Sequence, residues 1–233
     1  MKVCLRQMDH FDSKRKSKSV EIVEFVMSDM SNIWNKIYEN DASFFGEESS
    51  NFAISCYDTM KDKVKTILEL GCGQGRDSLF FASKGIKVKA LDYSQLAIEQ
   101  LSQLAKQKGL SINASTYDAT KPLPFSDSEF DAVYSHMLFS MGFTQEQLKF
   151  IFQEIKRVLK NNGFHFFSVR NHNDKFYGTG TRLDDEIYDI NGFQIRFFTK
   201  QEIENLSEGF KIIEIREEYE EPVTLYLVTA RKE

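Results

Sequence analysis

Residues 67–77 read ILELGCGQGRD, with glycines at three alternate positions. The apolar run at 65–71 ends in the first of these glycines, which predicts a buried strand followed by a tight turn. The helix formers at 76–85, closed by a glycine, predict a helix directly after the turn. Such a turn presents backbone N–H groups to a ligand, because glycine lets the ligand approach closely. Taken alone, the segment fits a dinucleotide site, a phosphate site, a methyl-donor site or a simple turn.

The spacing of the glycines departs from the dinucleotide pattern. That pattern is G-x-G-x-x-G, and Arg76 stands here where its third glycine would be. Asp92 ends the second predicted strand, about 20 residues after Gly71, where a carboxylate can accept hydrogen bonds from both hydroxyls of a ribose. Asp118 ends the third predicted strand, where it can meet an adenine amino group or simply cap the following turn. The glycine spacing, Asp92 and Asp118 together predict a site for an adenosine group that carries no pyrophosphate.

Strand and helix patterns alternate over most of the chain after residue 65, which predicts a parallel sheet with helices on both faces. The clearest helix follows Thr144, which fits a capping box with Gln147. The last two predicted strands are joined by a turn too short for a parallel crossover, so we expect them to pair antiparallel. The predicted strands are 65–71, 86–92, 111–118, 130–137, 164–169, 210–219 and 223–232. The fold class is therefore α/β, with a mostly parallel sheet whose last strand is reversed.

Three segments before the sheet carry apolar residues at helical spacing: 19–30, 31–40 and 49–62. The Ser- and Lys-rich residues 1–18 predict a flexible tail. We expect a single domain at 19–233, with a helical cap at 19–62. The connection at 170–198 is long for an α/β protein, and it forms either a lid over a pocket or an ordinary surface excursion.

The composition excludes several functional classes. The formal charge of the 233 residues is −5, which disfavours general nucleic-acid binding. No apolar run approaches the roughly 20 residues of a membrane helix, and no secretory signal is visible, so we expect a cytoplasmic protein. The three cysteines and four histidines are scattered, so we expect neither a disulfide framework nor a metal site. Oligomeric state stays open.

Several motifs, in order, resemble those of class I S-adenosylmethionine-dependent methyltransferases. They read ILELGCGQGRDS, ALDYS, TYDATKPLPFSDSEFDAVYSHMLF and LKNNGFHFFSV, and the resemblance covers roughly residues 30 to 233. It implies a Rossmann-like three-layer sandwich around a seven-stranded sheet with the last strand antiparallel. It also implies S-adenosyl-L-methionine as the cofactor. Pieces near 178–199 are weakly similar to tellurite-resistance and thiopurine methyltransferases.

The resemblance assigns roles residue by residue. Asp92 would bind the ribose, with Tyr93 beside the adenine, and Arg76 could pair with the carboxylate of the donor. Cys72 would be a small loop residue between glycines, not a nucleophile. In similar proteins an N-terminal aromatic helix closes over the donor, which points to Trp34 and Tyr38. The predicted cofactor-binding residues are Trp34, Tyr38, Glu69, Gly71, Cys72, Gly73, Gly75, Arg76, Asp92, Tyr93, Ser94, Asp118, Ala119, Ser135, His136 and Leu138.

His136 is the one candidate for a catalytic role, at the end of the fourth predicted strand. A methyl group on a sulfonium is already activated, so a base is required only if the acceptor must lose a proton. His136 otherwise lines the pocket as a polar side chain. In similar methyltransferases the segment corresponding to 170–198 builds the acceptor pocket. Its candidate substrate residues are Arg170, His172, Tyr177 and Arg182.

The sequence therefore predicts an enzyme that transfers a methyl group in line from S-adenosylmethionine to a small-molecule acceptor. An NAD-dependent oxidoreductase on a related fold is the first alternative, which Arg76 and the reversed last strand disfavour. A non-catalytic module that binds the donor is the second alternative. One nucleotide of a structured RNA as the acceptor is less favoured, given the acidic charge.

Overall fold

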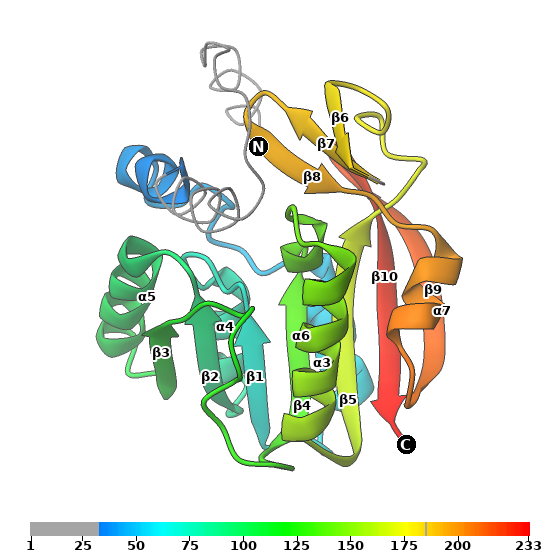
Figure 1. Ribbon diagram of the computed structural model, residues 1–233. Helices are drawn as coiled ribbons and strands as arrows, with labels where there is room; N and C mark the ends of the chain where they lie inside the picture. Colours follow the sequence, from blue (N-terminus) through cyan, green and yellow to red (C-terminus); the bar gives the residue numbers. More distant parts are fainter. Residues whose placement is uncertain (1–32, 185) are drawn as a thin grey trace.

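The computed structural model describes residues 33–184 and 186–233 (Figure 1). The predicted tail at 1–18 and the predicted helix at 19–30 lie outside these residues. The main sheet has seven strands in the order β3-β2-β1-β4-β5-β10-β9. Only β10 runs antiparallel to its neighbours, which confirms the predicted fold class. The strands are β1 (Thr66–Leu70), β2 (Lys87–Asp92), β3 (Ile112–Thr116), β4 (Phe130–His136), β5 (Leu159–Arg170), β9 (Phe210–Glu220) and β10 (Val223–Lys232).

Helices cover both faces of this sheet and make it the middle of three layers. They are α3 (Asn51–Met60), α4 (Arg76–Ser83), α5 (Gln95–Gln107), α6 (Gln145–Val158) and α7 (Lys200–Leu206). One apolar core packs α6 and α7 against the sheet, and the other packs α3, α4 and α5 against the opposite face. In Figure 1, α6 lies in front of the sheet and α3 lies behind it.

Local sequence signals place the helix starts as predicted. Thr144 and Gln147 form a complete capping box at the start of α6, so two backbone N–H groups that helix geometry leaves unpaired are satisfied. The buried face of α6 carries the predicted apolar stripe, Leu148, Ile151, Phe152, Ile155 and Val158. Apolar residues at this spacing hold the helix on the sheet.

The carboxyl ends of the parallel strands meet at the upper edge of the sheet in Figure 1. Two segments lie above that edge. Residues 33–40 form a helix, and a small antiparallel sheet follows β5. The small sheet consists of β6 (Thr181–Asp184), β7 (Ile187–Ile190) and β8 (Phe193–Arg196). The long connection at 170–198 thus contains three strands, which the sequence did not predict.

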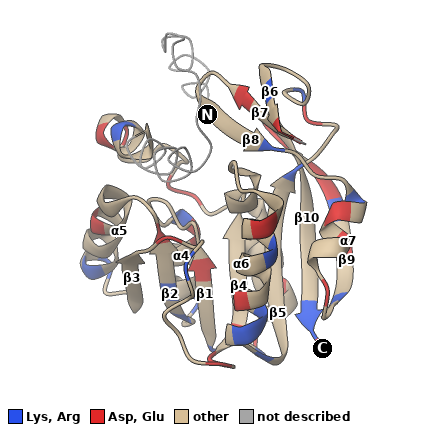
Figure 2. Cartoon of the chain, viewed as in Figure 1, with Lys and Arg blue, Asp and Glu red and all other residues tan. Residues whose placement is uncertain are grey.

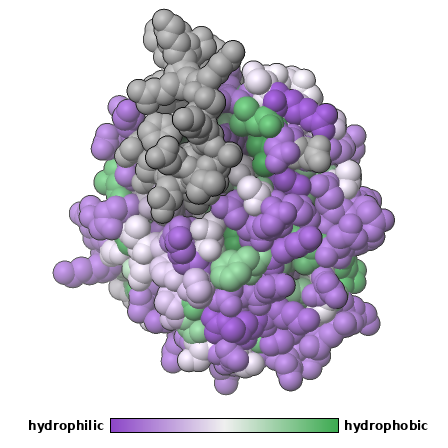
Figure 3. Space-filling model, in the orientation of Figure 1, coloured by the Kyte–Doolittle hydropathy of each residue, from purple (hydrophilic) through white to green (hydrophobic). Residues whose placement is uncertain are grey.

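The segment before β1 divides into two parts with different surroundings. Helix α3, predicted at 49–62, buries Phe52 and Cys56 in the core against α4 and the sheet. Among the described residues before β1, those at 33–47 face the edge where the strands end. On the face drawn in Figure 3, apolar residues form separate small patches among hydrophilic ones.

Candidate active site

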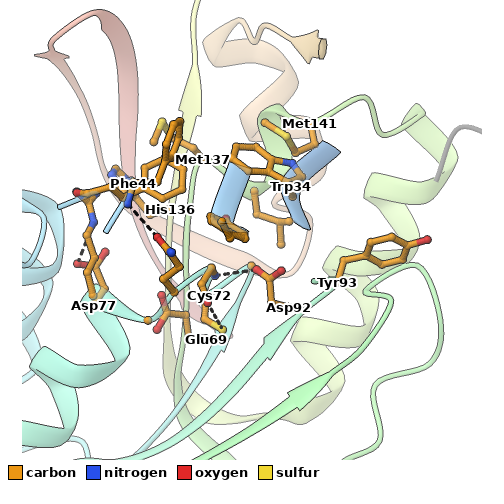
Figure 4. A pocket seen from close by; sticks show the side chains of 18 of the residues that line it. Trp34, Phe44, Glu69, Cys72, Asp77, Asp92, Tyr93, His136, Met137 and Met141 are labelled. Carbon is orange, nitrogen blue, oxygen red and sulfur yellow. Dashed lines mark hydrogen bonds and ion pairs between the residues drawn. The ribbon is translucent and has the colours of Figure 1, made fainter. Parts of the chain in front are cut away.

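A cavity of about 730 Å³ lies at the carboxyl edge of the main sheet (Figure 4). Its volume is typical of a small-molecule site. Its walls come from the Gly-rich turn, the ends of β2 and β4, residues 34–47, the small sheet and the turn between β9 and β10. Ligands of open α/β sheets bind at this edge, near the point where the strand order reverses. In this sheet that point lies between β1 and β4.

The three glycines of the turn adopt backbone angles that favour glycine, with φ of 70° at Gly71, 51° at Gly73 and 85° at Gly75. Gly71 and Gly75 also lack room for a Cβ atom. A Cβ on Gly71 would lie 2.9 Å from Leu138 Cδ1, and one on Gly75 would lie 2.2 Å from Leu101 Cδ1. The glycines therefore allow close packing by neighbouring side chains as well as the turn itself.

Asp92 closes the turn from the end of β2. Its Oδ2 accepts from the Gly73 N–H at 2.7 Å, and its Oδ1 accepts from the Ser94 N–H at 2.8 Å. Burial raises the pKa of Asp92, and these N–H donors oppose the rise. A carboxylate offers about four acceptor positions, so lone pairs remain on both oxygens for a diol. This half-buried acceptor on the cavity wall fits the ribose of S-adenosylmethionine.

Burial shifts two other acidic groups at the turn toward their neutral forms. Burial and the nearby Asp77 raise the pKa of Glu69 well above its usual value, and the Ser78 hydroxyl donates to Glu69 Oε2. Glu69 thereby ties the strand β1 to the first turn of α4. Burial also raises the pKa of the Cys72 thiol, which disfavours the reactive thiolate. Cys72 thus lines the cavity as a small neutral residue.

The predicted adenine end of the cavity includes Tyr93, Asp118 and Ala119. In Figure 4, Tyr93 extends beyond Asp92, on the side away from His136. Asp118 Oδ1 accepts from both the backbone N–H and the hydroxyl of Thr120, so Asp118 caps the turn that follows β3. Asp118 thus both lines the cavity and caps the turn, so capping the turn does not exclude a contact with an adenine amino group.

Aromatic side chains roof the cavity. Trp34 stacks on Tyr38 with ring centroids 5.6 Å apart, and it packs on Phe45 at 5.9 Å. Trp34 also meets Phe193 of β8 edge to face at 5.8 Å. The N-terminal helix and the small sheet therefore touch each other above the cavity, and Trp34 makes the contact.

Arg76 lies at the start of α4 and is held by three groups. Its Nη1 donates to the Phe45 carbonyl at 2.8 Å, and its Nε lies 3.8 Å from Asp77 Oδ1. Its Nη2 lies 3.6 Å from Glu220 Oε1, at the end of β9. The guanidinium lines the cavity, so a carboxylate of a ligand can reach it.

His136 has a neighbour at each ring nitrogen. Nδ1 lies 2.6 Å from Ser168 Oγ, and Nε2 lies 3.2 Å from Glu220 Oε2. The Met137 N–H also donates to Ser168 Oγ. His136 lines the cavity with a polar neighbour already beside each ring nitrogen.

Several predicted site residues do not line the cavity. Ser94 caps α5 and donates to Asn35, and Ser135 is fully buried in β4. The other three, His172, Tyr177 and Arg182, lie in or beside the small sheet and away from the cavity wall. His172 pairs with Glu186 at 2.7 Å and stacks on Tyr177, so this pair stabilises the small sheet.

Arg170 does line the cavity, but its charge is already matched. Its Nε and Nη2 donate to the two carboxylate oxygens of Asp174, at 3.0 and 2.9 Å. A bidentate pair of this kind is strong and directional. Arg170 therefore presents little free positive charge to a substrate.

The sequence reading missed several lining residues. They are Phe44, Phe45, Phe176, Ile190, Phe193, Gln194, Ile195, Glu220 and the turn that follows Glu220. One signal was available, because β9 was predicted parallel to the central strands. Its carboxyl end, and hence Glu220, must then lie at the ligand-binding edge.

Among residues 33–184 and 186–233, no cluster of three or more His, Cys, Asp or Glu side chains has a geometry suited to a metal ion. Within the same residues no helix is both long and apolar enough to cross a membrane.

Comparison with known proteins finds similarity to methyltransferases. Residues 67–163 match the family model described as "Methyltransferase domain". The probable S-adenosyl-L-methionine-dependent methyltransferase TehB of Haemophilus influenzae is 27% identical over 99 residues, which are 42% of this chain and 34% of that protein. Tocopherol O-methyltransferase of Arabidopsis thaliana is 31% identical over 119 residues, 50% of this chain and 33% of that protein. The matches thus span about a third of these relatives.

A solved structure extends the likeness to nearly the whole chain. The 1,6-didemethyltoxoflavin-N1-methyltransferase of Burkholderia thailandensis, solved with S-adenosylhomocysteine, has a TM-score of 0.72 and 18% identity. The alignment covers 95% of this chain and 93% of that one. Residues 67–163 therefore match a methyltransferase domain, and the chain has the Rossmann-like fold of this solved methyltransferase.

Proposed function

We propose that this protein is an S-adenosylmethionine-dependent methyltransferase that acts on a small-molecule acceptor. The observation that carries the proposal is the half-buried Asp92 carboxylate, which lines the cavity and is joined to the Gly-rich turn through Gly73. Bound S-adenosylmethionine would supply an activated methyl group on its sulfonium. Asp92 would hold the ribose, and Arg76 would hold the carboxylate of the methionine part.

The chain's own contribution is to align the acceptor and exclude water. The aromatic roof of Trp34, Phe45 and Phe193 and the side chains of Met137 and Met141 enclose an apolar space beside the end of β4. Enclosure of this kind favours in-line attack, because it fixes the nucleophile and removes competing water. A cavity of about 730 Å³ that also holds the donor leaves room for a small acceptor, which supports a small molecule.

The first role proposed for His136 is to line the pocket, and the second is to act as a general base. Its two ring nitrogens face Ser168 and Glu220, so it can accept a proton from an acceptor only after one of these contacts opens. An acceptor that needs no deprotonation requires no such movement.

Turnover tests this function directly. The full chain is incubated with S-adenosylmethionine and pools of small alcohols, thiols, amines and heterocycles, and release of S-adenosylhomocysteine is measured. We expect release above the acceptor-free rate with at least one pool, and a loss of that release in Asp92→Ala. Donor binding without release from any pool would instead support a non-catalytic binding module.

A further inference from the structure

One end of the cavity carries a carboxylate whose charge is not fully matched. This end lies at β4, β5 and β9, on the far side of the Gly-rich turn from Asp92 and Asp118. With the donor placed as proposed above, its adenosine lies toward β2 and β3. The acceptor must then enter from the β4 and β9 side, and this inference therefore rests on the proposed function.

The two arginines at this end are each paired with an aspartate. Arg170 forms a bidentate pair with Asp174, whose side chain is fully buried. Arg76 lies beside Asp77, which also accepts from Ser50 and Tyr134. Each pair sums to zero charge. Lys108, another cation on the cavity wall, ends α5 beyond β2, at the opposite end of the sheet.

The Glu220 carboxylate is the charge at this end of the cavity that these two pairs do not balance. Burial alone raises the pKa of Glu220, but His136 and Arg76 outweigh it, so the pKa lies below its usual value and the side chain is ionised. Its Oε2 lies 3.2 Å from His136 Nε2, and both arginines at this end are already paired with an aspartate. The contact with Arg76 is long, at 3.6 Å, and Arg76 is shared with Asp77 and the Phe45 carbonyl.

The surroundings of Glu220 add to its preference for a cation. Figure 2 shows further acidic residues, coloured red, toward the same end of β9. The remaining wall at this end is apolar and aromatic, with Met137, Met141, Phe176 and Phe193. Aromatic faces attract a cation, and a partly buried carboxylate attracts it more strongly than it would in water.

We propose that Glu220 selects acceptors that carry a basic nitrogen, such as a protonated amine, joined to an apolar body. The nitrogen binds the Glu220 carboxylate, and the apolar body packs among the aromatic and methionine side chains. The basic nitrogen is thus the acceptor group that Glu220 binds, which need not be the atom that is methylated. A protonated nitrogen has no lone pair, so the methyl group goes to another atom, or the nitrogen first loses its proton.

Three probes with one apolar body and different charge test this preference. They are phenethylamine, phenethyl alcohol and hydrocinnamate, titrated calorimetrically into the full chain saturated with S-adenosylhomocysteine. We expect the amine to bind at least about tenfold more tightly than hydrocinnamate, with the alcohol between them. In Glu220→Gln we expect this ratio to fall to about threefold or less.

Glu214→Gln is the matched control, because Glu214 is exposed on the same strand and the charge change is the same. It should leave the ratio unchanged. Glu220→Asp, which keeps the charge, should retain the preference for the amine. Melting temperatures of all variants verify that each is folded.

Three results would overturn the inference: hydrocinnamate binding as tightly as the amine, no measurable amine binding, or an unchanged ratio in Glu220→Gln. The titration with S-adenosylhomocysteine comes first and separates the two claims. No binding of S-adenosylhomocysteine contradicts the proposed function. Binding of S-adenosylhomocysteine without an amine preference contradicts only the role of Glu220.

Discussion

The backbone N–H of Gly73 donates to Asp92 Oδ2 at 2.7 Å, and this bond joins the Gly-rich turn after β1 to the end of β2. The Gly-rich turn and Asp92, which the sequence presents as separate features, therefore form one structural unit. The turn needs a buried acceptor for its N–H groups, and the carboxylate needs donors to offset its burial. The same carboxylate keeps acceptor positions on the cavity wall.

Replacing Asp92 tests this unit. In Asp92→Ala we expect the affinity for S-adenosylhomocysteine to fall by about 2 kcal/mol, roughly 30-fold in Kd, because the ribose hydroxyls lose a charged acceptor. Calorimetry measures the change. Asp58→Ala is the control, since Asp58 is an exposed aspartate on α3, and it should bind as the parent does. Equal affinities in the two variants would remove Asp92 from the site.

Trp34 offers an optical test of the roof. It is the single tryptophan of the 233 residues, and it lines the cavity against Tyr38, Phe45 and Phe193. Binding of S-adenosylhomocysteine should change its environment, and so its emission intensity or wavelength. The fluorescence titration should give the same Kd as calorimetry. Constant emission at saturating ligand would place Trp34 away from the donor.

The glycines of the turn can be tested for packing as well as for backbone freedom. Gly75→Ala forces a Cβ to within 2.2 Å of Leu101 Cδ1 at a φ of 85°, so we expect a loss of about 3 kcal/mol in the free energy of unfolding. Gly85→Ala has a nearly equal φ of 83° and no atom within 4 Å of the added Cβ.

Gly85→Ala should therefore cost only about 1 kcal/mol, the backbone part alone. Urea denaturation of both variants gives the comparison. Similar losses in both would show that the contact with Leu101 relaxes without cost.

His165 links stability to pH. It lies in β5 among Phe139, Phe152, Phe167 and Phe210, and burial lowers its pKa from 6.5 to about 3. The folded protein keeps His165 neutral, whereas the unfolded chain binds a proton below pH 6.5. Stability is therefore full above about pH 6.5 and falls as the pH drops toward 3.

Between pH 7 and pH 5 this group should remove about 2 kcal/mol from the free energy of unfolding. His165→Leu lacks the titrating group, so its loss over the same interval should be smaller by that amount. Urea denaturation at the two pH values measures the difference. The same pH dependence in parent and variant would show that His165 is protonated in the folded protein.

The main sheet could be predicted because its signals are local. Apolar runs ending in glycine or aspartate marked β1 and β2, and the short turn after β9 required an antiparallel partner. The Gly-rich turn and Asp92 could be read for the same reason, since sequence spacing along parallel strands sets their place at the edge.

The small sheet over the cavity was missed although one signal was present. Asn191 and Gly192 stand between β7 and β8 with φ of 55° and 87°, and Asn-Gly is a strong hairpin signal. The strands on either side have only four residues each, too short for a clear alternating pattern.

The partners of charged side chains could not be predicted at all. Arg170 and His172 were expected to face a substrate. Instead, Arg170 pairs with Asp174, and His172 pairs with Glu186. The contact between Glu220 and His136 joins residues far apart in the chain, and only the order of strands in the sheet brings them together. Such pairings depend on the tertiary fold, which residue type and spacing do not encode.

The central claim is that the cavity binds the adenosyl donor of a methyltransferase. Calorimetric titration of the full chain with S-adenosylhomocysteine and, separately, with NAD tests it most directly. We expect saturable binding of S-adenosylhomocysteine at a ratio of about one per chain and no comparable binding of NAD, since the turn lacks the third glycine of the dinucleotide pattern. Tight binding of NAD with no response to S-adenosylhomocysteine would contradict the account.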